Sequence, residues 1–216
     1  MVVGLAGLSA HAATVDIGGG WSASWPDSLN PYVEIVPLGV EENADGGYVF
    51  IRKEAIFIQG PQLGVFPSIP ITFQQTQVDA YEFIVIEEEI IENQTGVPWS
   101  DFHMLLEEVG DAAFDPVRTA ASGGPATLGF DVSPFTSHSF TPINTLLNLE
   151  GGEVANGATW TPGAGLDGGA LFIDVVPNSE PDSLTTFTLK ETPTPEPAAV
   201  TLMLLGGAAV LARRSR

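Results

Sequence analysis

Short runs in which apolar and polar residues alternate, separated by turns, constrain this chain more than any other feature. Residues 171–175 (LFIDV) place Leu171, Ile173 and Val175 on one face of an extended segment. Side chains two positions apart share a face of a β-strand, so this spacing predicts a half-buried strand. No long segment repeats its apolar residues at helical spacing. The pattern therefore predicts an all-β fold for residues 13–191.

Several further segments have the length and composition of strands, and turns rich in glycine, proline or asparagine separate them. They cover residues 32–38, 48–58, 80–92, 101–109, 127–132, 153–160 and 185–190. The 24 glycines and 17 prolines supply the turns that many short strands require. We expect one domain, an antiparallel β-sandwich of about 7–9 strands.

The longest candidate strand, residues 81–92 (YEFIVIEEEIIE), does not keep a single apolar face. Two interpretations are open. A bulge at the three glutamates would restore an apolar inner face. Alternatively, residues 83–86 are buried on both faces and the strand then emerges into solvent at Glu87, Glu88 and Glu89. We expect the emergence, because burying three adjacent carboxylates is prohibitively costly.

The chain is strongly acidic. It carries 27 Asp and Glu against 7 Lys and Arg, which gives a net charge of −20. Such a field repels nucleic acid and anionic lipid, so we expect no nucleic-acid partner, and a solvated acidic surface is the simplest interpretation. The chain has no cysteine, which excludes disulfides, thiolate metal sites and a cysteine nucleophile.

The N-terminal end has the features of an export signal. Residues 1–12 are apolar and end in small residues at Ala10 and Ala12. A signal peptidase accepts small residues before the cleaved bond, so we expect a signal peptide that is cleaved after Ala12. Its positively charged start is missing, since Arg52 is the first basic residue, and a start codon further upstream would explain this. The alternative is a buried N-terminal strand.

The C-terminal end has three parts. Residues 192–197 (TPTPEP) predict an extended spacer without regular pairing, because alternating prolines remove amide donors. Residues 198–212 carry no charge and predict a transmembrane helix rather than an amphipathic core helix. Its length of about 22 Å is short for a hydrocarbon core of about 30 Å, but snorkelling arginines and local thinning offset the difference. Residues 213–216 form a basic cytoplasmic tail with Arg213, Arg214 and Arg216.

Pro195, Glu196 and Pro197, the apolar segment and the terminal arginines together resemble the PEP-CTERM sorting signal of bacteria, also labelled an ice-binding protein C-terminal domain. The resemblance covers roughly the last 22 residues. It implies an exported protein that its helix anchors in the inner membrane. It also implies cleavage near residues 195–197 by an exosortase-type enzyme and transfer to the cell surface or an extracellular polysaccharide matrix. The label carries no evidence of ice binding.

Residues 93–103 (NQTGVPWSDFH) predict a hairpin. The asparagine and threonine can bond to backbone groups of the turn, the glycine supplies a positive φ, and the tryptophan caps the core. The residues assigned to this element are Asn93, Thr95, Gly96, Trp99, Asp101 and His103. We expect Phe102, Met104 and Leu106 to face inward. The segment also resembles an N-x-T-G-x-x-W-x-D-F-H element in β-sandwich domains of PEP-CTERM proteins, which implies architecture rather than activity.

Candidate chemistry is sparse. Asp101 and His103 lie about 7 Å apart on one strand face, which suits acid–base catalysis or metal binding. No third convergent group is apparent, so a turn-stabilising aspartate and a packed histidine are the simpler interpretation. Residues 43–47 (NADGG) come nearest to a calcium loop, but a plain turn explains them. We expect no metal, no cofactor and no catalytic residues.

The expected function is that of a non-enzymatic exported protein at the cell surface or in the matrix. Its partners would be the processing enzyme, the membrane and matrix polysaccharide. The alternative is a carbohydrate-binding module for matrix glycans, if the tryptophans lined one face. These are Trp21, Trp25, Trp99 and Trp160, for which packing in the core is the default. A hydrolase centred on Asp101 and His103 is the least favoured function.

Overall fold

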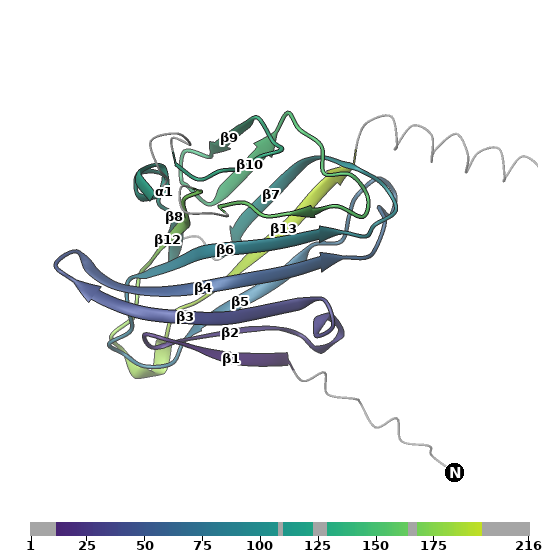
Figure 1. The fold of residues 1–216 in the computed structure, drawn as a ribbon. Coiled ribbons are helices and arrows are strands. Elements are labelled where there is room, and N and C mark those ends of the chain that lie inside the picture. The colour runs from purple at the N-terminus through teal and green to yellow at the C-terminus, as the bar shows by residue number, and fades with distance from the viewer. Residues whose placement is uncertain (1–11, 108–109, 123–128, 164–167, 196–216) are drawn as a thin grey trace, which may run out of the picture.

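The computed structural model describes residues 12–107, 110–122, 129–163 and 168–195, which form two β-sheets packed face to face (Figure 1). The first sheet contains, in spatial order, β1 (Ala12–Gly18), β2 (Trp21–Pro26), β5 (Ile69–Gln75), β13 (Thr186–Pro195), β7 (Trp99–Glu107), β10 (Leu146–Glu150) and β9 (Ser137–Phe140). The second contains β3 (Val33–Asn43), β4 (Gly46–Phe57), β6 (Phe83–Asn93), β12 (Leu171–Val175) and β8 (Ala112–Phe114), with β11 (Thr159–Trp160) paired to β6. The short helices are η1 (Asp27–Leu29), α1 (Pro116–Ser122) and η2 (Pro181–Ser183).

The predicted all-β sandwich is confirmed, with two differences. The described residues contain thirteen strands, more than expected, because several are only two to five residues long. The first sheet is antiparallel throughout, whereas β4 and β6 of the second sheet run parallel. The chain leaves β4, forms β5 in the opposite sheet and then returns as β6. This crossover allows the parallel pairing.

Most predicted strands are present with shifted bounds, and two predictions need correction. Of residues 153–160, only Thr159–Trp160 form a named strand. Residues 129–132 are not a strand, and the rest of the predicted 127–132 segment lies outside the described residues. Phe130 and Val132 are nevertheless buried. Their apolar alternation reflects a loop that packs onto the core.

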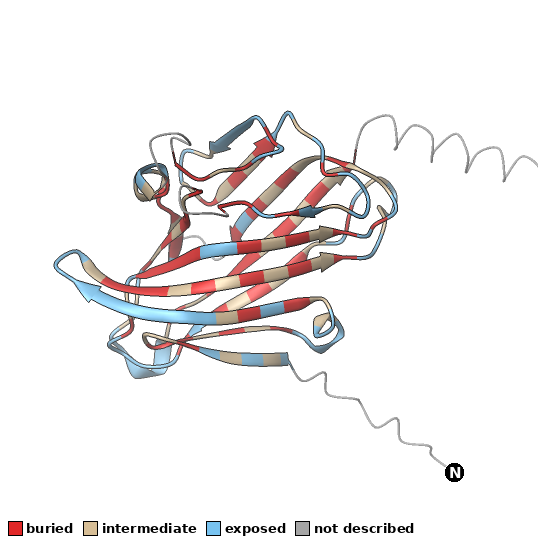
Figure 2. Cartoon of the chain, in the orientation of Figure 1, coloured by how far each residue is buried: buried red, intermediate tan, exposed pale blue. Residues whose placement is uncertain are grey.

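One apolar core lies between the sheets and draws inward residues from both (Figure 2). Phe102, Met104 and Leu106 of β7 are at most 1% exposed, which confirms their predicted inward orientation. A second, smaller cluster lies on the outer face of the second sheet and contains Tyr48, Phe83 and Val85. The far end of the β3–β4 hairpin is exposed and projects beyond the core (Figure 2).

A bulge in β6 decides where its glutamates point. The β4–β6 register passes from Ile51↔Ile86 to Arg52↔Glu88, so Glu87 has no partner on β4. Residues 83–86 are buried on both faces and Glu87 and Glu88 are exposed, as predicted. Glu89 is only 2% exposed, so the prediction that all three glutamates emerge is wrong. The extra residue changes the strand's parity and turns Glu89 toward the core.

The prediction of an unpaired spacer from residue 192 is also wrong, because β13 continues to Pro195 and pairs with β7. Leu106 of β7 donates its amide away from β13, to the Thr145 carbonyl. Its partner Leu189 therefore also points its amide away from β7. By the two-residue repeat, the nitrogen of Pro193 faces the same way, where pairing with β5 has already ended at Glu191. This proline costs no ladder hydrogen bond.

Candidate functional site

The most unusual cluster of side chains is a lysine with two glutamates in the core of the sandwich. Lys53 lies on β4, Glu89 on β6 and Glu191 on β13, and each is at most 2% exposed. Lys53 Nζ lies 2.6 Å from Glu191 Oε1 and also contacts Glu89 Oε1. We call these three residues the buried Lys–Glu cluster.

Strand geometry explains why the cluster forms. Lys53 and Glu89 are direct partners in the parallel β4–β6 register, and Glu191 reaches them from the facing sheet. The neighbouring inward positions, including Ile51, Ile91 and Leu189, are fully buried. A cluster in such surroundings has no access to bulk water, so each charge depends on the others for stabilisation.

Burial and mutual contact shift the acid–base equilibria of the cluster. Burial raises the pKa of Glu89 to about 8, an effect that Lys53 opposes and Glu191 reinforces. For Lys53, burial alone would lower the pKa, but attraction to Glu191 and then Glu89 outweighs it and raises the pKa. At neutral pH the cluster therefore favours a charged lysine and a protonated Glu89.

Sequence reasoning missed this cluster, although part of the signal is present. Lys53 shares its parity with Ile51, Ala55 and Phe57, which predicts an inward position for it. Glu191 likewise follows the inward parity of its strand. No local pattern reveals that these positions meet, and the inward turn of Glu89 requires the bulge in β6.

The predicted hairpin motif forms a different element, because β6 and β7 belong to different sheets. Residues 93–99 are a corner between the sheets. Asn93 is fully buried and donates to the Val97 and Val154 carbonyls, each at 2.9 Å. Its Oδ1 accepts from the Thr95 amide at 3.1 Å and from the Thr95 hydroxyl at 2.7 Å. Thr95 in turn accepts from Trp99 Nε1 at 3.2 Å.

Asn93 and Thr95 bond to backbone groups of this corner, and Gly96 has a positive φ of 88°, whereas Asp101, expected to stabilise a turn, lies within β7. The Gly96 amide donates to Asn156 Oδ1 at 2.8 Å, which ties the corner to the loop before β11. The described geometry of the motif is that of a structural corner. The polar side-chain atoms of Asn93, Thr95 and Trp99 all have hydrogen-bond partners within the protein.

Asp101 and His103 share the outer face of β7, but they form no catalytic pair. The His103 Nδ1 atom lies 2.9 Å from Asn148 Oδ1, and Nε2 lies 3.1 Å from Thr194 Oγ1. Both ring nitrogens thus have partners on the neighbouring strands. The Ser100 hydroxyl donates to Asp101 Oδ2 at 3.5 Å, and within the described part of the chain no hydrogen bond joins Asp101 to His103. This arrangement is that of a packed histidine between strands.

All four tryptophans are buried, so they form no exposed platform for sugar rings. Trp25 is the most exposed of them, at 8%. A different aromatic surface lies beside α1, in an open groove of about 330 Å³. Its lining includes Tyr48, Phe50, Phe172 and Arg118. The Arg118 guanidinium pairs with Asp115 at 2.8 Å and lies 4.3 Å from the Phe83 ring centroid.

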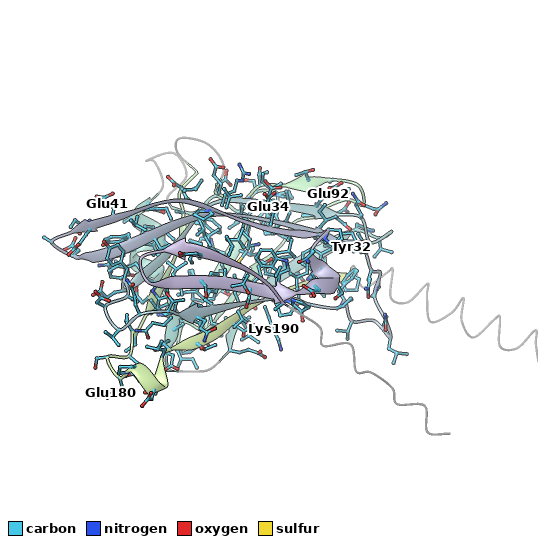
Figure 3. All side chains as sticks on the ribbon, turned by 90° about the horizontal axis from the view of Figure 1, so that it is seen from below. Tyr32, Glu34, Glu41, Glu92, Glu180 and Lys190 are labelled. Carbon is cyan, nitrogen blue, oxygen red and sulfur yellow. The ribbon has the colours of Figure 1, made fainter. Side chains whose placement is uncertain are left out.

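The acidic surface expected from the composition is visible where Glu34, Glu41 and Glu180 project into solvent (Figure 3). Of the sorting residues, the structure describes Pro195, the last residue of β13, and Ala12, the first residue of β1. The others lie outside the described residues: Ala10, Glu196, Pro197, Arg213, Arg214 and Arg216. The predicted transmembrane helix lies there too. No helix in the described ranges is long and apolar enough to cross a membrane.

Comparisons with protein families, with curated proteins and with solved structures give no significant match to this chain. Its function is therefore argued from its own residues.

Proposed function

We propose that this chain is a non-enzymatic exported β-sandwich protein, which a C-terminal tail anchors in the inner membrane until an exosortase-type enzyme processes it. The observation that carries the proposal is the order of the last residues. Pro195, Glu196 and Pro197 precede fifteen uncharged residues, and three arginines follow at once. An apolar segment with a basic end inserts with that end in the cytoplasm.

The position of this motif relative to the sandwich also supports the proposal. Strand β13 is a central strand of its sheet and ends at Pro195, so the motif begins at the edge of the folded body. Cleavage at this point would remove the anchor without removing any named strand. The processed protein would then be the intact acidic sandwich at the cell surface or in the matrix.

Cell fractionation tests the proposal. A tagged chain is expressed in a bacterium that has an exosortase-type enzyme, beside a version that lacks residues 196–216. We expect the full chain in the membrane fraction, together with a shorter processed form. The truncated chain should be neither membrane-bound nor processed. If the truncated chain is membrane-bound and processed like the full chain, the proposal is wrong.

Matched substitutions separate the charge of the tail from its length. Replacing Arg213, Arg214 and Arg216 by lysine keeps the positive charge, and replacing all three by glutamine removes it. We expect normal membrane retention for the lysine variant and defective retention for the glutamine variant.

The aromatic groove favours a second candidate function, the binding of matrix glycans. Phe50 and Phe172 are partly exposed beside Arg118, a combination suited to stacking and hydrogen bonding with sugars. We expect the purified sandwich to bind the host's matrix polysaccharide and the Phe50→Ala variant to bind about tenfold more weakly. Leu63→Ala, at a fully exposed apolar residue outside the groove, is the control. Equal binding by both variants would exclude the groove.

A further inference from the structure

We propose that Lys53 and Glu191 condense to form an amide bond that joins the two sheets covalently, with Glu89 relaying the proton. The proposal is independent of the sorting function. It concerns the buried Lys–Glu cluster, which belongs neither to the aromatic groove nor to the corner at residues 93–99.

The distances and the burial are those that such a reaction requires. Lys53 Nζ lies 2.6 Å from Glu191 Oε1, so the carboxyl carbon is one C–O bond beyond that atom. Rigid strands of both sheets hold the two groups together, and this raises their effective concentration greatly over that of free groups.

The desolvation cost of the buried charges favours their conversion to a neutral amide. Each buried charge loses its hydration, and the cost is several kcal/mol per ion in a typical protein interior. Among the described residues, the five buried terminal atoms of the cluster have no hydrogen-bond partner outside the cluster. An amide carries no net charge, and its N–H and C=O can both bond to a protonated Glu89. Exclusion of water also protects the product from hydrolysis.

The step balances without any further reactant. Protonated Glu89 gives its proton to the Glu191 carboxylate and takes one from the Lys53 ammonium, and the neutral amine then attacks the carbon of the neutral Glu191 carboxyl group. A C–N bond forms, one C–O bond breaks, and the leaving oxygen takes two protons and departs as water. Glu89 ends as it began, protonated, and acts only as a general acid and base. The sum is one ammonium and one carboxylate converted to one amide and one water molecule.

We assign Glu191 as the acyl partner and Glu89 as the relay from their positions in the two sheets and from the protonation of Glu89. Burial holds Glu89 in the protonated form that a proton relay needs, since its pKa is raised to about 8. Glu191 approaches from the opposite sheet, so its bond to Lys53 closes a connection between β4 and β13. Glu89 is already next to Lys53 in the same sheet.

Mass spectrometry of the denatured full chain tests the proposal. We expect a mass lower than that of the unmodified chain by one water molecule. Trypsin cannot cleave after an acylated Lys53, so peptide 53–118 should appear covalently linked to the peptide that begins at Glu191. Finding no loss of water overturns the proposal. A linkage from Lys53 to Glu89 overturns the assignment of Glu191.

Variants and an internal control sharpen the result. Glu89→Gln keeps the shape of the relay but removes its acid–base function, so we expect the unmodified mass from the folded variant. Lys190, labelled in Figure 3, is partly exposed. It forms an ion pair of similar length, 2.7 Å, with Glu107. We expect this pair to remain unlinked in the same sample, because both side chains are partly exposed to water. A folded Glu89→Gln variant that still loses water overturns the role of Glu89.

Discussion

At the scale of single residues, Glu89 couples the stability of the sandwich to pH. Its pKa rises on folding from an ordinary value of 4.5 to about 8. A group with a raised pKa stabilises the fold fully below its unfolded pKa, and this stabilisation is lost as pH rises through its folded pKa. We therefore expect the unfolding free energy to fall between about pH 5 and pH 8, measured by urea denaturation.

The Glu89→Gln variant provides the control for this prediction, because it removes the titrating group. Burial also raises the pKa of Asp174. Asp174 therefore makes stability fall with rising pH in both proteins. The difference in slope between the two profiles, rather than the difference in absolute stability, is therefore assigned to Glu89, because the amide proposed above would be present in the wild-type protein alone. If both proteins lose stability with the same slope over this range, the assignment of the pH dependence to Glu89 is wrong.

Asn93 is the residue on which the inter-sheet corner depends. Its side chain makes four hydrogen bonds in a fully buried position. We expect Asn93→Ala to lower the unfolding free energy by about 3 kcal/mol, since it leaves several buried partners unsatisfied. Asn156→Ala removes one exposed hydrogen bond to the same corner and should cost less than about 1 kcal/mol. Equal losses would contradict a special role for Asn93.

At the scale of elements, the last turns of β13 show how a strand accommodates proline. Pro193 points its nitrogen away from β7, whereas Thr192, opposite His103, points its amide toward β7. We expect Thr192→Pro to destabilise the fold by more than about 1 kcal/mol, because it removes a ladder hydrogen bond. Pro193→Val, which breaks no such bond, should be nearly neutral. Denaturation curves of the two variants measure the difference, and the reverse order would contradict the register.

The corner at residues 93–99 is a second feature at the scale of elements. Local sequence identified the turn chemistry of residues 93–99 correctly, because asparagine, threonine and glycine impose it on neighbouring backbone. It did not identify that the two strands enter different sheets. Turn residues set the direction of the chain locally, while the sheet that a strand joins depends on partners distant in sequence.

At the scale of the whole molecule, the position of the last strand sets where the folded body ends. Residues 192–195 pair with β7, and Pro193 and Pro195 are buried. We expect a chain that ends at Pro195 to unfold at a higher urea concentration than one that ends at Glu191. The shorter chain loses both the pairing and the buried area. Identical midpoints would indicate that residues 192–195 contribute nothing to the fold.

The sequence by itself determined the all-β class, the approximate positions of the five longest strands and the inward faces of runs such as residues 171–175, but it did not predict β1, β2, β5, β8, β9 or β10. The correct predictions follow from side-chain alternation, which is a local property of extended backbone. The tertiary structure alone decided the parallel pairing of β4 with β6, the inward turn of Glu89 and the meeting of Lys53 with Glu191. Each of these depends on register between strands distant in the chain, and one extra residue in a strand is enough to change it.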